Sequence, residues 1–311
     1  MRFWELVEPS GSDYKHVQVN GKLEHPYRLP AAECDACGSS VAEWNVVLPY
    51  ACPDSMRKHP LLTDPDAEVP IKAFQKLERE LATELRRSGV KKPALAPGAF
   101  LQPGFLDVPS VPTSDFLWSA LSSGLSTVVV SDRVGSLLQE HCKSTDIALC
   151  PVTPRRIGKR SAKSTPKLPK SGEPEDMMKE YKAAKVVSVG PYYELVVLAQ
   201  SGYPPGTEPG PVCRVCGESL RQAPEYYSLQ RRAWDNLTPA VLESVWGGAS
   251  IFRLVEKGTL LVVDELKKRL EEMRLSNICF REFPISRPSA ALNRRPARLP
   301  TVRKSQKGGG R

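Results

Sequence analysis

Between residues 70 and 88, apolar side chains recur every three or four positions, which is the period of one face of an α-helix. A proline near the start and a glycine after the end are typical of helix boundaries. The opposite face carries interspersed acidic and basic residues, as a solvent-exposed face does. The sequence therefore predicts an amphipathic helix over residues 70–88. Its apolar positions are Ile71, Phe74, Leu77, Leu81 and Leu85.

Runs of β-branched and aromatic residues predict strands at residues 2–7, 44–48 and 186–199. The last run passes through Gly190-Pro191, a turn signal, so a hairpin is expected there. Residues 93–112 are rich in proline and glycine and are expected to form a loop or linker. Strand and helix signals in one chain indicate the α+β class.

One strand-helix pattern occurs twice. Residues 127–140 (TVVVSDRVGSLLQE) and 259–272 (TLLVVDELKKRLEE) align at a constant offset of 132. In each copy a β-branched run ends at an aspartate, Asp132 or Asp264, which is expected to cap the following helix.

A second short strand follows each predicted helix, at residues 147–149 and 278–280, and closes on Pro151 and Pro284. The repeated strand-helix-strand pattern suggests two related α/β units, with an insertion enlarging the first half. Chance recurrence stays open, because β-α-β stretches of this length are common.

The chain has 311 residues with 41% hydrophobic content, enough for one large core or two smaller ones. No apolar run approaches the roughly 20 residues that a membrane-spanning helix needs. The first residues lack the cationic stretch and apolar core of a signal peptide. These features predict a soluble, cytoplasmic protein.

The formal net charge of +9 is concentrated in two segments rich in proline and serine. Residues 287–311 contain eight basic and no acidic residues, which predicts a disordered tail. The second cluster, in a predicted solvated linker, comprises Arg155, Arg156, Lys159, Arg160, Lys163, Lys167 and Lys170. Without these fifteen cations the remaining chain carries a formal charge of −6. The two segments are expected to bind polyanions weakly, because no aromatic residues are interleaved for base stacking.

This composition divides the chain into four parts. The N-terminal half spans residues 1–152, the basic linker residues 153–180, the C-terminal half residues 181–286 and the tail residues 287–311.

Two copies of the motif Cys-X-X-Cys-Gly, at residues 34–38 and 213–217, are the densest set of potential metal ligands. The two-residue gap lets both sulfur atoms of a tight turn face one ion, and the glycine tolerates the positive φ of such a turn. Four thiolates complete a tetrahedral zinc site with no position for a substrate. We therefore expect a structural zinc ion held by Cys34, Cys37, Cys213 and Cys216. The 179-residue separation leaves open whether both pairs share one ion.

Two other interpretations of these cysteines stay open, and a disulfide framework is not assumed. A redox-active pair is expected at the start of a helix, whereas both motifs lie among proline, glycine and glutamate. Disulfide bonds need an oxidising compartment, for which the sequence gives no signal. The pairs could also bind metal weakly or not at all.

Four further cysteines lie outside the motifs. Cys142, Cys150 and Cys279 occur in apolar stretches, where a free cysteine behaves as a small hydrophobic residue, so we expect burial. Cys52 lies close enough to the first motif to be a spare ligand, but an inert loop residue is the simpler interpretation.

Catalytic patterns are sparse. The histidines, His16, His25, His59 and His141, show neither metal-site spacing nor an evident nucleophile partner. The sequence contains no glycine-rich phosphate loop and no nucleophile-elbow motif. It therefore nominates no nucleophile or base for an enzyme.

Taken together, the two motifs and the residues around them give the chain a resemblance to the double-CXXCG motif proteins, a family with many paralogues in myxobacteria. The likeness covers most of residues 1–285 and includes the N-terminal strand from Met1 to Leu6 and Leu29-Pro30 before the first motif. It is reinforced by a closing stretch that runs from Phe252-Arg253-Leu254 through residues 259–275 to Phe280-Arg281-Glu282-Phe283-Pro284. The basic linker and tail depart from the family's compact pattern and inherit no family role.

The resemblance implies an immunity protein, a non-enzymatic cytoplasmic antidote that binds one cognate polymorphic toxin of the kind delivered between kin by outer-membrane exchange. The CXXCG zinc knuckles would then be scaffold, and the position of the toxin-binding surface stays open. One alternative is a zinc-ribbon protein associated with nucleic acid, which the basic segments suggest. Another is a thiol oxidoreductase, which would require a low thiol pKa at Cys34 or Cys213.

Overall fold

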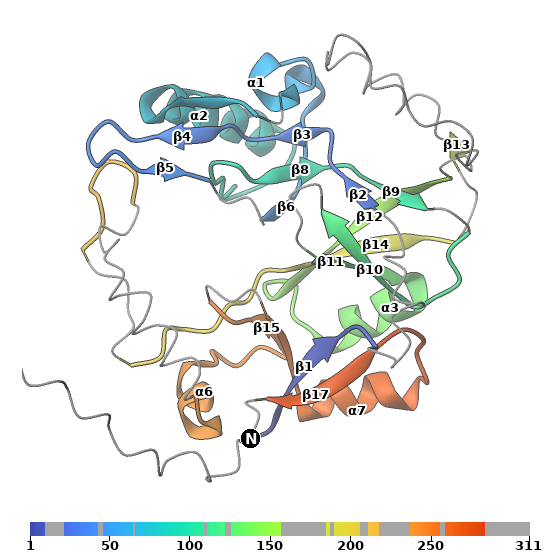
Figure 1. Cartoon of the computed structure of the whole chain (residues 1–311). Coiled ribbons are helices and arrows are strands. Elements are labelled where there is room, and N and C mark those ends of the chain that lie inside the picture. The colour runs from blue at the N-terminus through green and yellow to red at the C-terminus, as the bar shows by residue number, and fades with distance from the viewer. Residues whose placement is uncertain are drawn as a thin grey trace, which may run out of the picture.

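The computed structural model describes residues 1–9, 22–42, 46–64, 66–108, 111–121, 126–156, 185–186, 190–205, 211–217, 237–255 and 259–283. These residues form helices and four β-sheets, which confirms the α+β class. Helix α2 (Ile71–Arg87) lies at one end of the molecule and helix α7 (Asp264–Glu272) at the other (Figure 1). No helix in the described ranges is long and apolar enough to cross a membrane.

Six strands between these two ends close into a barrel. In the order β12-β14-β11-β10-β2-β9, they are Ile147–Arg156, Tyr192–Val197, Ser126–Ser131, Phe116–Leu121, Lys22–Glu24 and Gly104–Val108. The barrel closes because β12 pairs with β9 as well as with β14. The short strand β13 (Lys185–Val186) pairs with the end of β12. Side chains such as Leu23, Leu106 and Val129 fill the interior and are fully buried.

A second sheet lies beside the barrel and packs against α7. Its strands, in order, are β15 (Ile251–Arg253), β16 (Leu260–Val263), β1 (Phe3–Val7) and β17 (Cys279–Phe283). The N-terminal strand thus lies in the middle of a sheet that the C-terminal part of the chain otherwise builds. Helix α6 (Pro239–Val245) covers part of this sheet, where Trp246 packs edge to face on Phe3. One apolar core joins this sheet to helix α3 (Asp132–His141) of the barrel.

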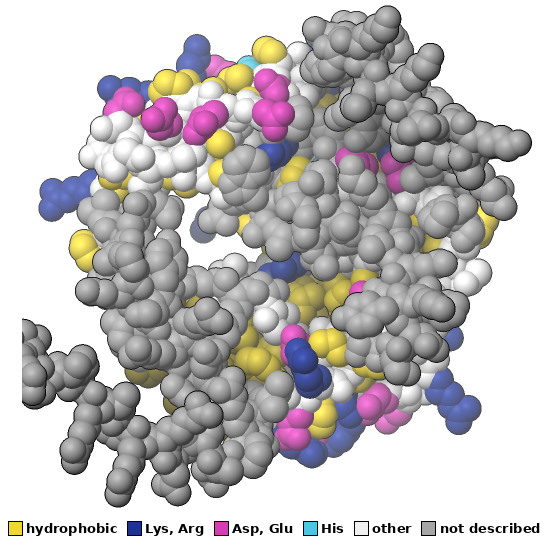
Figure 2. All heavy atoms as spheres, viewed as in Figure 1, with side chains coloured by type: hydrophobic (Ala, Val, Ile, Leu, Met, Phe, Trp, Pro, Cys, Tyr) yellow, Lys and Arg dark blue, Asp and Glu magenta, His cyan; other side chains and the backbone are white. Residues whose placement is uncertain are grey.

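Helix α2 confirms the predicted amphipathic helix. Its apolar face is buried against two three-stranded sheets, while its outward face carries interspersed acidic and basic side chains (Figure 2). The first sheet comprises β3 (Tyr27–Arg28), β8 (Phe100–Gln102) and β6 (Val47–Ala51), and the second β5 (Ser40–Val41), β4 (Ala31–Glu33) and β7 (Glu68–Pro70). The short helix α1 (Pro60–Thr63) and the 3₁₀ turn η2 (Asp54–Met56) complete this layer.

The suspected repeat is present in the topology. In the barrel, the sheet order β10-β11-β14-β12 places the central strand β14 between the two strands that flank α3. In the second sheet, the order β15-β16-β1-β17 places β1 between the two strands that flank α7. Both central strands are antiparallel to their neighbours. The two four-stranded units therefore have the same order and the same strand directions.

The pairing registers agree on one side of the central strand and differ by one residue on the other. Residues 3 to 5 of β1 face residues 263 to 261, and residues 192 to 194 of β14 face residues 131 to 129, which keeps the offset of 132. On the other side, residues 3 to 7 face residues 283 to 279, and residues 192 to 196 face residues 152 to 148. The central strands are themselves similar, FWELV in β1 and YYELV in β14. The shared strand order, strand directions and central-strand sequence favour an internal duplication, with one residue fewer between α7 and β17 than between α3 and β12.

Along the chain, one repeat runs from β1 through the first CXXCG motif to β12, and the other runs from β14 through the second motif to β17. The two repeats exchange their central strands. Strand β1 precedes the first CXXCG motif but completes the sheet of the second repeat, and β14 precedes the second motif but completes the sheet of the first. The predicted boundary between residues 1–152 and 181–286 therefore does not separate two sheets.

The repeated aspartates do not cap their helices as predicted. The residues at the N-cap positions are Ser131 and Val263, and neither makes a capping hydrogen bond, so each aspartate is the first helical residue. Asp132 instead accepts a hydrogen bond from the Tyr193 hydroxyl at 3.2 Å, and Asp264 accepts one from the Trp4 indole at 3.0 Å. Each aspartate thus joins its helix to the exchanged central strand.

Several local predictions were wrong. Residues 186–199 do not form a hairpin, because β12 lies between β13 and β14. Residues 93–112 are not only loop, since they contain β8 and β9. The strand predicted at residues 44–48 is present as β6 (Val47–Ala51), and residues 44–45 lie outside the described residues.

Strand β12 does not close at Pro151 but continues through Arg156. Residues 153–156 therefore belong to the barrel and not to a solvated linker. Arg155 in this stretch is buried and forms an ion pair with Asp107 at 2.7 Å. The rest of the basic linker, the basic tail and His16 lie outside the described residues.

Candidate metal centre

The first CXXCG motif forms the turn between strands β4 and β5. The Cys34 amide donates to the Ser39 carbonyl at 2.9 Å, and the Gly38 amide donates to the Cys34 carbonyl at 2.7 Å. Gly38 has φ = +69°, a left-handed conformation that glycine adopts without strain. The turn therefore directs the Cys34 and Cys37 side chains to the same side.

The second motif repeats this turn. The Gly217 amide donates to the Cys213 carbonyl at 2.8 Å, and Gly217 has φ = +78°. The Gln75 side chain of α2 donates to the Val215 carbonyl at 3.3 Å, which holds the second motif beside α2. Both glycines thus adopt the conformation that their place in the motif predicts.

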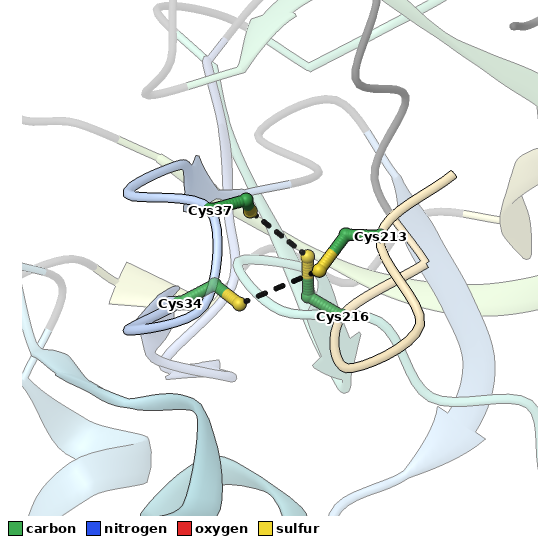
Figure 3. Close-up of side chains that lie close together, drawn as sticks. All are labelled: Cys34, Cys37, Cys213 and Cys216. Carbon is green, nitrogen blue, oxygen red and sulfur yellow. Dashed lines mark hydrogen bonds between the residues drawn. The ribbon is translucent and has the colours of Figure 1, made fainter. Parts of the chain in front are cut away.

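The structure brings the two motifs together across 179 residues of sequence. The Sγ atoms of Cys34 and Cys213 are 3.9 Å apart, and those of Cys37 and Cys216 are 3.6 Å apart (Figure 3). All four sulfur atoms lie within 4.8 Å of one another. Cys34 and Cys213 are buried, whereas Cys37 and Cys216 are half-buried. The four predicted site residues therefore form one cluster, in which each repeat supplies one pair.

These distances fit a metal ion bound by four thiolates. A tetrahedral ion with metal–sulfur distances of about 2.3 Å separates its sulfur ligands by roughly 3.8 Å. The two shortest cross-repeat distances, 3.6 and 3.9 Å, bracket that value. The remaining sulfur–sulfur distances are all within 4.8 Å, so the four thiolates lie close enough to surround one ion.

Two of the thiols are biased toward the thiolate form. A hydrogen bond from the Ser39 side chain, together with its backbone amide and the neighbouring thiols, lowers the pKa of Cys37 to about 6. Backbone hydrogen bonds from Cys216 and Val215 lower the pKa of Cys213. Because a thiolate is the form that binds metal, these hydrogen bonds prepare the cluster for an ion. Within their described residues, 34–38 and 213–217, both motifs are turns and not helical, whereas the cysteines of a thioredoxin-like redox pair begin a helix.

The remaining cysteines have no place in this cluster. Cys142 and Cys150 are buried as predicted, and burial raises the pKa of each thiol to about 12. Cys52 lies in the loop between β6 and η2, as predicted, but its side chain is buried in the core, and burial raises its pKa to about 11. Cys279 was expected to be buried but is exposed, because it lies on the outer strand β17 of its sheet.

A buried polar cluster inside the barrel could not be predicted from spacing. The Glu194 carboxylate is fully buried and accepts hydrogen bonds from the Gln102 amide at 2.8 Å and the Thr127 hydroxyl at 3.1 Å. The Nε2 atom of His25 lies 3.3 Å from the same carboxylate. Burial lowers the pKa of the Arg253 guanidinium, and the negative charge of Glu194 partly offsets this by raising it. This cluster joins β14 to neighbouring strands in the barrel interior.

The repeat is the one sequence signal that points to Glu194. Its equivalent in β1 is Glu5, at the same position of the FWELV and YYELV strands. Glu5 accepts a hydrogen bond from Arg281 at 2.8 Å on the outer part of its sheet. The same residue thus has an exposed ionic partner in one repeat and buried polar partners in the other.

Comparisons with known proteins give no independent assignment, since no protein-family model and no curated protein matches the chain. The geometry of the four cysteines therefore carries the functional argument.

Proposed function

We propose that this chain is a non-enzymatic immunity protein that binds and neutralises a cognate polymorphic toxin, with a structural zinc ion held by Cys34, Cys37, Cys213 and Cys216. The meeting of the two CXXCG motifs in one four-thiol cluster carries the proposal. This paired motif is the feature on which the resemblance to the double-CXXCG family mainly rests.

The arrangement of the cluster favours a scaffold role for the metal. Four thiolates fill every position of a tetrahedral zinc ion, so no position is left for a substrate or an activated water molecule. The ligands also come from both repeats, and an ion there would join them. An antidote needs such a rigid body to present an accurately shaped surface to its partner.

A nucleic-acid function receives less support. The basic run that suggested it begins inside the barrel, where Arg155 is already paired with Asp107. Its guanidinium also stacks 4.5 Å from the ring of Phe105. This arginine is therefore occupied by contacts within the protein.

Co-expression tests the proposal. Cells that produce the toxin encoded beside this gene should grow when the wild-type chain is also produced. The proposal would be wrong if killing continued while the chain accumulated as a folded, metal-loaded protein.

A further inference from the structure

An open groove lies where α3 meets the exchanged strand β14. Residues 111–115, residues 190–192 and the end of α7 form its other walls, and its volume is about 880 Å³. This volume falls within the range of pockets that receive ligand-sized groups. The apolar part of its lining comprises Val111, Pro112, Leu137, Pro191 and Met273.

Hydrogen bonds between the walls keep this groove open. The Tyr192 hydroxyl donates to the carbonyls of Pro112 and Ser114, each at 3.2 Å. The Asp132 amide donates to the Pro191 carbonyl at 3.1 Å. The Arg133 guanidinium donates to the Met273 carbonyl and ties α3 to the end of α7. A preformed groove loses little conformational entropy when a partner binds.

The polar lining is acidic. Asp115, Asp132 and Glu140 contribute three carboxylates against the single guanidinium of Arg133, which already has a partner. Partial burial would raise the pKa of Asp115, but hydrogen bonds from Ser276 and Ser131 outweigh it and hold the pKa below its ordinary value. The groove therefore carries net negative charge at neutral pH.

This charge selects the kind of partner. The N-terminus of a helix ordinarily favours an anion, but Asp132 already places a carboxylate in the first turn of α3. A phosphate in the groove would meet three carboxylates. A cation between apolar walls has complementary charge and keeps its long aliphatic stem out of water.

We propose that this groove receives the cognate toxin, and that the toxin inserts a lysine or arginine side chain flanked by apolar residues. The inference rests on the proposed immunity function and assigns the surface that performs it. Val111, which is 47% exposed, meets the apolar flank, and the exposed Glu140 carboxylate meets the cation. The salt dependence of binding reports this charge pairing.

Two variants of the groove test the inference against the purified toxin encoded beside this gene. Glu140→Lys reverses an exposed charge, and Val111→Asp places a charge on the apolar wall. Each should weaken toxin binding about tenfold or more, as loss of a central charge pair or apolar anchor does. Both side chains are exposed, so the fold should persist, and circular dichroism together with metal content verifies it.

Matched controls lie elsewhere on the surface. Glu80→Lys makes the same charge change on α2, and Leu198→Asp makes the same apolar change at a side chain that is 41% exposed. Both controls should bind within about twofold of wild type. If the groove variants bind as well as wild type, or if the controls lose as much affinity, the groove is not the docking surface. A wild-type chain that neither binds nor rescues removes the proposed function itself, so the two failures are distinguishable.

Discussion

At the residue scale, the CXXCG motif specifies its own local geometry. Glycine is needed at positions 38 and 217 because each turn passes through positive φ, and the two-residue gap brings both sulfur atoms to one side. These properties are local, so the four site residues could be predicted from sequence. The choice of partner pair could not, because only the complete fold joins residues 179 positions apart. The contacts of His25 and Gln102 with Glu194 could not be predicted for the same reason, since these residues are far apart in the sequence.

Removing one sulfur from the cluster should destabilise the protein. In Cys34→Ser, three thiolates remain, metal affinity falls, and the stabilisation that metal binding gives to the folded chain is lost. We expect the free energy of unfolding to fall by at least about 2 kcal/mol. Cys279→Ser is the matched control, because Cys279 is exposed and lies outside the cluster. Urea titration of both variants checks the difference, and an equal effect would exclude a special role for Cys34.

Asp115 gives a prediction about pH. Its carboxylate accepts hydrogen bonds from the amide and hydroxyl of Ser276, both at 3.0 Å, and from Ser131 at 3.0 Å. These bonds lower its pKa in the folded state below 3.8, so their stabilisation is present above pH 3.8 and is lost as the pH falls through the lowered value. Asp115→Asn should therefore cost about 1–2 kcal/mol at pH 7 and progressively less below pH 3.8. Denaturant titrations of both proteins at pH 7 and pH 3 measure this difference, and a constant difference would contradict the assignment.

At the element scale, the strength of the periodic signal decided which predictions were confirmed. Helix α2 has a long apolar stripe and matches its predicted span within one residue at each end. The short strands β8 and β9 lie in a segment dense in proline and glycine, where local signals favour loops and long-range pairing overrides them. The sequence predicted strands at the positions of β1 and β14. It did not predict which strands they pair with, because periodicity does not specify strand pairing.

The hydrogen bond that ties β14 to α3 should contribute measurably to stability. Tyr193→Phe removes the hydrogen bond from β14 to Asp132 and should cost about 0.5–1.5 kcal/mol. In Asp132→Ala with Tyr193→Phe, the second change should add almost nothing, because alanine leaves no oxygen to accept the hydrogen bond. A double-mutant cycle measured by chemical denaturation checks this coupling. Full additivity would mean that the hydroxyl and carboxylate do not interact.

At the scale of the whole molecule, strand exchange makes the two halves interdependent. Each four-stranded unit lacks its central strand without the other half, because β1 lies in the second unit and β14 in the first. The metal cluster has the same property, since each half supplies one cysteine pair. A central strand that is missing exposes two rows of unpaired backbone groups and opens the core.

Neither half should therefore fold alone. We expect chains 1–170 and 171–311, produced separately, to lack cooperative unfolding, and the two produced together to form a complex that unfolds cooperatively. Thermal unfolding monitored by circular dichroism provides the measurement, with the uncut chain as the control. Cooperative unfolding of either half by itself would contradict the exchange.

The central claim is that the two repeats are joined by one ion in a single four-thiolate site. Native mass spectrometry of the purified monomer measures it most directly, through the number of zinc ions per chain. We predict one zinc per wild-type chain and none when Cys34 and Cys213 are both replaced by serine. Two ions per chain, an ion shared between two chains, or a folded protein without metal would contradict the account.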